Sequence, residues 1–223
     1  TSSTYFYDLA YYTTATCAFD NVYTVSNIVY VGTASDKPFV WSARDASFGL
    51  DTSGYEFQLG CNSKTPDYLQ IESGTYKFGT TRIGYTTGAT VGLTMNGGTL
   101  SANKLRVSGG KSGVNGTLTI NGGTVTTSAT GDDVVMICDQ PDTKGTLIID
   151  GGALTTTSGN QVCIGGVDEI DVKIYVNTGG VWDAKRLILG GKRAQTYSVT
   201  NSVTKIEVNG GTLNLEGENG IGF

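Results

Sequence analysis

The chain has 223 residues, with 15 basic and 20 acidic side chains, no histidine, 33 glycines and three prolines. Its net charge of −5 comes from interspersed acidic and basic residues, so it lacks the concentrated basic face that nucleic-acid binding requires. Apolar residues make up 38% of the chain, but no apolar run is long enough for membrane insertion. The absence of histidine excludes imidazole as a catalytic base or metal ligand.

Residues 1–30 are rich in tyrosine and depart from the pattern that follows them. A coil of repeats needs an atypical end to cover its open core, so we expect these residues to form an N-terminal cap. The repeating turns then occupy residues 31–223, within a single domain that spans 1–223. The sequence stops inside a repeat, which predicts that this domain is a piece of a larger multidomain protein.

Beyond the first 30 residues, a unit recurs about every 24–32 residues: an apolar-x-apolar strand, an Asn-Gly-Gly corner, and two more short strands. The clearest copies of the first strand and its corner are residues 93–100, 118–125, 147–154 and 206–213, and degenerate copies are 69–76 and 174–181. Internal repeats of this length indicate an extended, repetitive architecture.

Strict alternation within each strand places every second residue inside the coil. The inside column then contains Leu69, Leu93, Leu118, Leu147, Ile174 and Ile206. No single turn can bury its own apolar face, so successive turns must pair as parallel strands. We therefore predict an all-β fold, a single-stranded right-handed parallel β-helix of about eight turns with three short strands per turn.

A second column lies at the corners, at Asn96, Asn121, Asp150, Asn177 and Asn209. Asn and Gly tolerate positive φ, which suits a sharp bend, and stacked Asn side chains can hydrogen-bond to one another. We interpret this column as a corner ladder in preference to a binding track.

The cysteines, Cys17, Cys61, Cys138 and Cys163, have no C-x-x-C spacing, so a zinc site is not expected. Cys138 and Cys163 are offset in adjacent turns and too far apart for an easy bridge, which leaves a Cys17–Cys61 disulfide as an option. The acidic loop residues are either solvated or ligands of Ca²⁺, the one cofactor that the sequence allows. They are Asp132, Asp133, Asp139 and Asp142.

A basic group occupies equivalent outward positions in two turns, at Arg82 and Arg106, with Lys104 on the same strand as Arg106. Such a group could bind an acidic sugar by paired hydrogen bonds, as a polysaccharide lyase would require. The alternative is a solvated pair that Glu56 or Glu72 neutralises.

Aromatic residues interrupt the polar background of the turn at residues 174–189. The repeat aligns Trp182 with outward Thr126 and Thr155, and it also places Tyr175 and Ile188 outside. Aromatic rings with polar neighbours are typical of sugar-binding sites. Alternatively, the loop at 191–204 covers Trp182 as a small satellite core. The predicted ligand-binding residues are Trp182, Tyr175, Asn177, Asp183, Lys185, Gln195 and Tyr197.

The strand-Asn-Gly-Gly-Thr-strand units across residues 67–223 resemble the autotransporter-associated β-strand repeats of bacterial surface proteins. The size of the chain and its capped form also resemble the β-helical carbohydrate-binding modules attached to bacterial xylanases. The second resemblance implies a non-catalytic domain that holds plant xylan near a hydrolase. It carries no diagnostic motif, so it assigns no residue.

A glycoside hydrolase needs two carboxylates at a fixed separation, and the outward strand positions carry no such pair. We therefore expect a non-catalytic module, monomeric and either secreted or on the bacterial cell surface, that binds a plant cell-wall polysaccharide for a tethered catalytic domain. Xylan is the favoured polysaccharide. The alternatives are a structural spacer or adhesin segment and, next, a lyase that acts on an acidic glycan.

Overall fold

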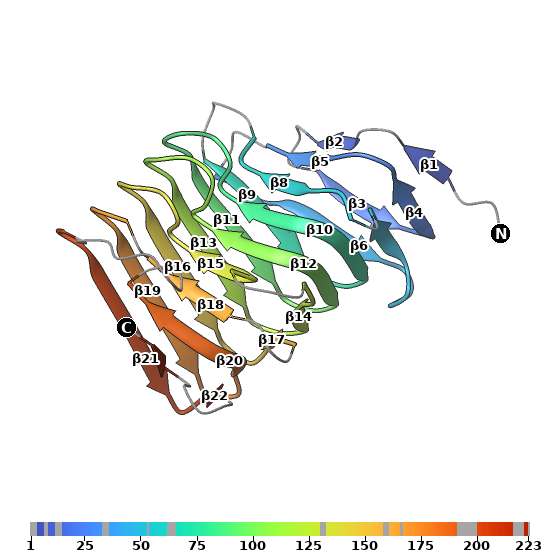
Figure 1. The fold of residues 1–223 in the computed structure, drawn as a ribbon. Helices are drawn as coiled ribbons and strands as arrows, with labels where there is room; N and C mark the ends of the chain where they lie inside the picture. The colour runs from blue at the N-terminus through green and yellow to red at the C-terminus, as the bar shows by residue number, and fades with distance from the viewer. Residues whose placement is uncertain are drawn as a thin grey trace.

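Parallel strands stack into a β-solenoid in the computed structural model, and all regular structure in its described residues is β-strand (Figure 1). The structure describes residues 4–6, 9–11, 15–32, 36–52, 54–61, 66–129, 133–157, 161–165, 167–190, 200–215 and 221–222. Apart from the strands at the two ends of the described stack, each strand pairs with its equivalents one turn earlier and one turn later, which confirms the predicted fold class.

The coil has three faces. Face one is an eight-stranded sheet made of β3 (Thr16–Phe19), β6 (Phe39–Ala43), β9 (Asp67–Ile71), β11 (Thr90–Met95), β13 (Asn115–Ile120), β16 (Lys144–Ile149), β19 (Asp171–Asn177) and β21 (Val203–Asn209). The other two faces form one continuous sheet because three long strands run across both of them. These are β10 (Thr75–Ile83), β12 (Thr99–Val107) and β20 (Val181–Leu189).

Face two combines the first halves of those long strands with β1 (Thr4–Phe6), β4 (Val22–Val25), β7 (Gly49–Asp51), β14 (Thr124–Thr127), β17 (Ala153–Thr156) and β22 (Thr212–Leu215). Face three combines their second halves with β2 (Leu9–Tyr11), β5 (Val29–Val31), β8 (Phe57–Leu59), β15 (Val135–Ile137), β18 (Gln161–Ile164) and β23 (Ile221–Gly222).

The predicted inside column of face one is confirmed residue by residue, from Leu69 paired with Leu93 to Ile174 paired with Ile206. On face three, the register of the last apolar segment differs from the alignment of the repeats. Alignment of the repeats places Ile221 opposite Leu189, but Ile221 pairs with Leu187, two residues earlier. The stack has about six turns, slightly fewer than the eight expected.

Aromatic side chains fill the interior of the N-terminal turns. Trp41 is buried, and its ring stacks on Tyr76 with centroids 5.2 Å apart and an interplanar angle of 21°. Residues 1–30, expected to form a cap, contain strands β1 and β2, which pair in parallel with β4 and β5. In the described residues this segment therefore extends the stack.

The corner after face one carries the predicted polar ladder. Asn121 Nδ2 donates a hydrogen bond to Asn96 Oδ1 at 2.9 Å, and Asn96 Nδ2 donates to Glu72 Oε1 at 2.9 Å. Further along the stack, Asn209 Nδ2 donates to Asn177 Oδ1 at 3.2 Å. These bonds support the interpretation of the column as a structural ladder between turns.

Candidate functional site

Trp182, the residue on which the predicted sugar site depends, lies inside the coil and is fully buried. It pairs with Leu154 on one side and Leu213 on the other, and not with the outward column of Thr126 and Thr155. The prediction is wrong because the corner after Asn177 contains one residue more than the Asn-Gly-Gly corners. A shift of one residue moves every following side chain to the opposite side of a strand.

The remaining predicted site residues do not converge. Tyr175 points outward and is partly exposed on face one, in register with Ile148 and Glu207, as expected. Asp183 lies on face two, where it accepts a hydrogen bond from Asn214 Nδ2 at 2.5 Å. Lys185 follows it at an irregularity of β20, with a φ of 58°, and Asn177 belongs to the corner ladder. Gln195 and Tyr197 lie outside the described residues.

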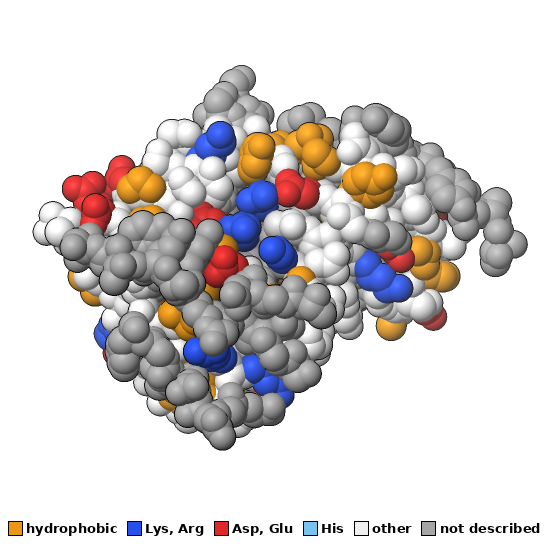
Figure 2. Space-filling view, viewed as in Figure 1, with side chains coloured by type: hydrophobic (Ala, Val, Ile, Leu, Met, Phe, Trp, Pro, Cys, Tyr) orange, Lys and Arg blue, Asp and Glu red, His pale blue; other side chains and the backbone are white. Residues whose placement is uncertain are grey.

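Arg82 and Arg106 are direct register partners on face three, as the repeat predicts. Each guanidinium already forms an ion pair: Arg82 Nη2 lies 2.9 Å from Glu56 Oε1, and Arg106 pairs with Asp139. In Figure 2, which views this face, basic and acidic side chains lie side by side and form no separate basic patch. The alternative that a glutamate neutralises the pair is therefore confirmed for Arg82, and neither arginine lacks a counter-ion.

The electrostatics of Glu56 follow from these contacts. Burial raises the pKa of its carboxyl, but hydrogen bonds from Arg82 and Gln58 and the charges of Arg82 and Arg106 outweigh burial, so the pKa is lowered below 4.5.

Lys104, predicted to join this basic group, is only partly buried and pairs in register with Thr80.

Further along face three, the outward column continues through Met136, Cys163 and Ile188. These three side chains point out of the coil, yet all are buried, and they form a second apolar cluster separate from the main core. The repeat predicts that Ile188 points outward. Its direction is as predicted, but its burial removes it from the accessible surface.

Two of the acidic residues considered as Ca²⁺ ligands, Asp139 and Asp133, make contacts with other side chains or the backbone. Asp139 pairs with Arg106 and accepts a hydrogen bond from the Gly110 amide at 2.8 Å, and Asp133 accepts one from Cys163 Sγ at 3.0 Å. Asp142 has a positive φ of 55°, and Asp132 lies outside the described residues. Among the described residues, no three acidic or sulfur-containing side chains converge on a metal site.

None of the four cysteines, all in the described part of the chain, forms a disulfide. The separation argued for Cys138 and Cys163 is consistent with this finding, and the optional Cys17–Cys61 bridge is not formed.

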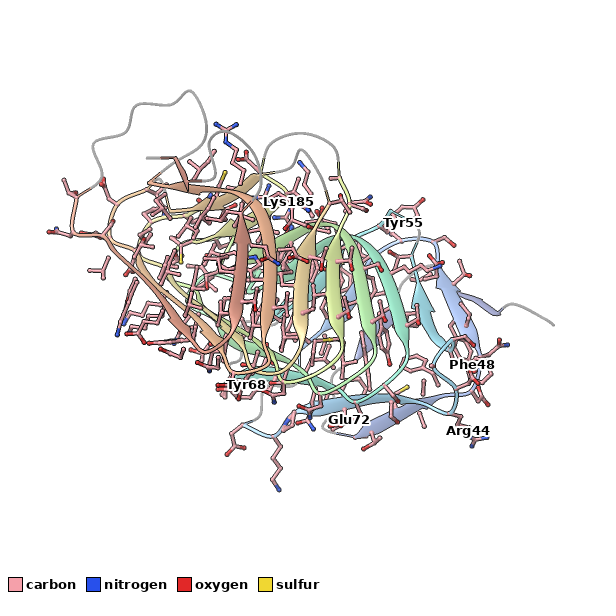
Figure 3. All side chains as sticks on the ribbon, turned by 90° about the horizontal axis from the view of Figure 1, so that it is seen from below. Arg44, Phe48, Tyr55, Tyr68, Glu72 and Lys185 are labelled. Carbon is pink, nitrogen blue, oxygen red and sulfur yellow. The ribbon has the colours of Figure 1, made fainter. Side chains whose placement is uncertain are left out.

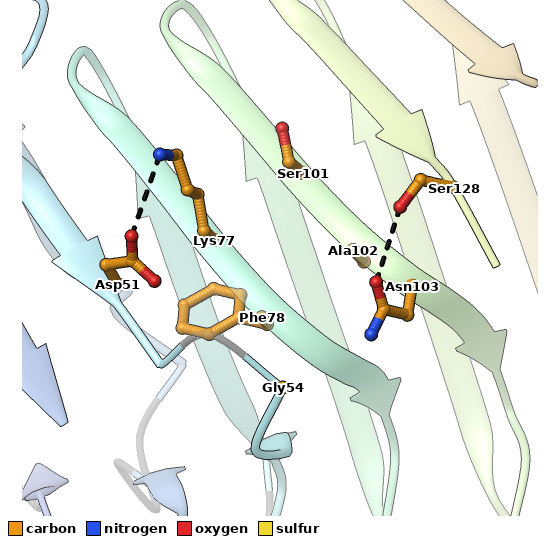
Figure 4. Close-up of a pocket in the computed structure, with 8 residues that line it drawn as sticks. All are labelled: Asp51, Gly54, Lys77, Phe78, Ser101, Ala102, Asn103 and Ser128. Atoms are coloured by element: carbon orange, nitrogen blue, oxygen red, sulfur yellow. Dashed lines mark hydrogen bonds and ion pairs between the residues drawn. The ribbon is translucent and has the colours of Figure 1, made fainter. Parts of the chain in front are cut away.

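The described surface has a groove where face two bends into face three (Figure 4). Its volume is about 340 Å³, and its lining residues come from β7, β10 and β12, from the loop at Gly54 and from the residue directly after β14. They are Asp51, Gly54, Lys77, Phe78, Ser101, Ala102, Asn103 and Ser128. Short polar side chains therefore surround a floor to which Phe78 and Ala102 contribute.

The polar groups of the groove are balanced in charge. Lys77 Nζ lies 3.6 Å from the Asp51 carboxylate, and Ser128 Oγ donates a hydrogen bond to Asn103 Oδ1 at 3.3 Å. Together with Ser101 they offer hydroxyl, amide, ammonium and carboxylate groups within one depression. Such a set can both donate hydrogen bonds to a ligand's hydroxyl groups and accept them.

The loop beside β10 builds one wall of the groove. The carbonyl of Tyr55 accepts hydrogen bonds from the Gly79 amide at 2.7 Å and from Thr52 Oγ1 at 2.9 Å. A Cβ on Gly79 would lie 2.0 Å from the carbonyl oxygen of Gly54, so only glycine lets the loop approach the strand this closely. Glycine within a strand signals such an approach. Gly79 is thus the sequence signal that could have located the groove.

Tyr55, next to Gly54 in this loop, has 47% of its surface exposed. In Figure 3, Tyr55 lies on the opposite side of the coil from Tyr68, which belongs to face one. Tyr55 follows the lining residue Gly54 in the chain, and its own side chain is not one of the residues that line the groove.

The described residues contain no helix long and apolar enough to cross a lipid bilayer. Comparison with known proteins found no matching family model, no matching curated protein and no matching solved structure.

Proposed function

We propose that this β-solenoid is a non-catalytic module that binds a plant cell-wall polysaccharide in the groove between β7, β10, β12 and β14. The observation that carries the proposal is the composition of the groove: hydroxyl and amide groups together with one internally neutralised ion pair, next to the exposed Tyr55. Sugar hydroxyls need paired donors and acceptors, while the apolar face of a sugar ring packs on an aromatic side chain. Trp182 is buried and cannot provide the aromatic contact, so the exposed Tyr55 takes that role in the proposal.

A neutral polymer fits this groove better than an acidic one. Lys77 has its counter-ion in Asp51, and the basic residues Arg82 and Arg106 of face three have theirs in Glu56 and Asp139. The carboxylates of an acidic polysaccharide would have to compete with these aspartate and glutamate side chains for each lysine or arginine. Xylan with few acidic substituents is therefore the favoured ligand. The proposed setting is a secreted or cell-surface bacterial protein with a tethered glycoside hydrolase.

Affinity electrophoresis tests the proposal. We expect soluble arabinoxylan in the gel to retard the wild-type protein and polygalacturonate to leave its mobility unchanged. The double variant Asn103→Ala/Ser128→Ala should lose the retardation because two groove side chains that can hydrogen-bond to sugar hydroxyls are removed. The matched control is Thr94→Val/Thr119→Val, which changes two partly exposed residues on face one.

Two results would contradict the proposal. Retardation of the groove variant equal to that of the wild type would remove the groove as the site. No retardation of the wild type by any neutral plant polysaccharide would remove the function itself. Circular dichroism of each variant establishes that the fold is intact.

A structural spacer in a bacterial surface protein is the second candidate. It is favoured by the in-register eight-stranded sheet and by the asparagine ladder, which are features of a stiff, regular rod. A spacer should bind no glycan, so a wild-type protein that is retarded by no member of a cell-wall polysaccharide panel would favour this function.

A further inference from the structure

The groove adjoins a row of polar side chains on the outer side of face two. Ser101, which lines the groove, is the register partner of Thr126 on β14, and Thr126 is the partner of Thr155 on β17. Both threonines are only partly buried. The outer side of this face therefore presents one hydroxyl per strand on three consecutive strands, beginning inside the groove.

The ends of this row differ from its centre. One end is the Lys77–Asp51 ion pair, and the other is Asp183, which accepts a hydrogen bond from Asn214. Between them lie only neutral hydroxyl groups. A second, parallel row of hydroxyl groups lies two residues earlier on two of these strands, at Thr99 and Thr124. The surface between the charged ends thus matches a neutral ligand that is long, narrow and rich in hydroxyl groups.

The spacing of the row defines the repeat of that ligand. Neighbouring strands lie about 4.8 Å apart, so equivalent side chains recur at this interval along the coil axis. One β-linked pyranose unit of an extended polysaccharide has a similar length. A chain lying along the coil axis would therefore place about one sugar unit beside each strand over a few units. Successive β-linked units are turned relative to one another, so neighbouring strands would meet different edges of the sugar rings.

We infer that the groove is one end of an extended track in which a linear, neutral, β-linked polysaccharide lies along the coil axis, with about one sugar unit per strand from β7 to β17. This inference rests on the proposed function, because the same groove must bind the polymer. It adds that the ligand is an internal segment of a chain about five units long. A single sugar or a chain end would leave most of the track empty.

Isothermal titration calorimetry with β-1,4-linked xylo-oligosaccharides of two to six units tests the track. For the wild type we expect affinity to rise with each unit up to about five and then to level off. The variant Thr126→Val/Thr155→Val keeps both β-branched shapes and removes both hydroxyls. It should bind the disaccharide like the wild type and the pentasaccharide about tenfold more weakly, from the loss of two modest hydrogen bonds.

The control variant Thr94→Val/Thr119→Val removes two hydroxyls from face one and should bind every oligosaccharide like the wild type. Affinity that stays constant from two to six units, or an unchanged pentasaccharide affinity in the Thr126→Val/Thr155→Val variant, would overturn the track and leave the groove site in place. A wild type that binds neither arabinoxylan nor any oligosaccharide would overturn both proposals.

Discussion

On face two, the outward side chains Lys77, Ser101 and Thr126 reach solvent, whereas on face three the outward side chains Met136 and Cys163 are buried. The two faces are halves of one continuous sheet, and their strands share the same alternation. Their ion pairs differ in the same way. The side chains of Arg106 and Asp139 are 18% and 8% exposed, while those of Lys77 and Asp51 are 57% and 24% exposed.

This difference shows that a side chain can point outward from a β-solenoid and still be buried from solvent. Face three uses its outward charges for internal pairing, and face two leaves its polar groups available to a ligand. Substitutions on the two faces test this difference.

The largest effect is expected for Asp139→Ala on face three. It leaves the mostly buried Arg106 guanidinium without its counter-ion and removes the acceptor of the Gly110 amide. Breaking a buried pair in this way costs about 3–5 kcal/mol. Its counterpart, Asp51→Ala on face two, should cost less than about 1 kcal/mol because that pair is exposed. Urea unfolding measures both, and equal losses would contradict the difference between the faces.

A smaller effect is expected for Met136→Ala. This substitution leaves a cavity in the outer apolar cluster with Cys163 and Ile188, and it should lower the free energy of unfolding by about 2 kcal/mol. Thr126→Ala, at an outward position on face two, should change it by less than about 0.5 kcal/mol. If Met136→Ala were as mild as Thr126→Ala, the outer cluster would contribute little to stability.

The carboxyl group of Glu56 on face three makes the stability of the fold depend on pH. Because its pKa in the folded protein is lowered below 4.5, its ionised form stabilises the fold, fully so above that value. The contribution is lost as the pH falls through the folded pKa. Wild type should therefore exceed Glu56→Gln in stability at pH 7, and the difference should shrink below about pH 4.5. Thermal unfolding from pH 7 to pH 3 measures it, and a difference that grows toward acid would show the opposite sign.

The smallest effect is expected for Thr126→Val/Thr155→Val. Both side chains are partly exposed on face two, and valine keeps their β-branched shape, so stability should stay within about 0.5 kcal/mol of the wild type. Differential scanning calorimetry checks this. A large loss would mean that these hydroxyls maintain the fold, and their effect on ligand binding could then not be read separately.

Most of the scaffold could be predicted from the repeat. The inside column from Leu69 to Ile206 follows from alternation, and the ladder at Asn96 and Asn121 follows from the regular corners. The candidate site could not be predicted in the same way. Its groove depends on the loop at Gly54 that reaches Gly79, a contact between different turns that no single repeat contains.

Alternating apolar residues and glycine-rich corners are local properties, and the sequence by itself therefore determined the parallel coil, its three strands per turn and most of its register. The tertiary structure decided which side chains a ligand can reach. The one-residue excess in the corner at Thr178 turned Trp182 inward, and the outer apolar cluster of face three removed Ile188 from the open surface. Contacts with Glu56 and Asp139 neutralise the two arginines. The register of a strand depends on the number of residues in the corner before it, and the accessibility of a side chain depends on contacts between turns. Neither property is contained in the pattern of one repeat.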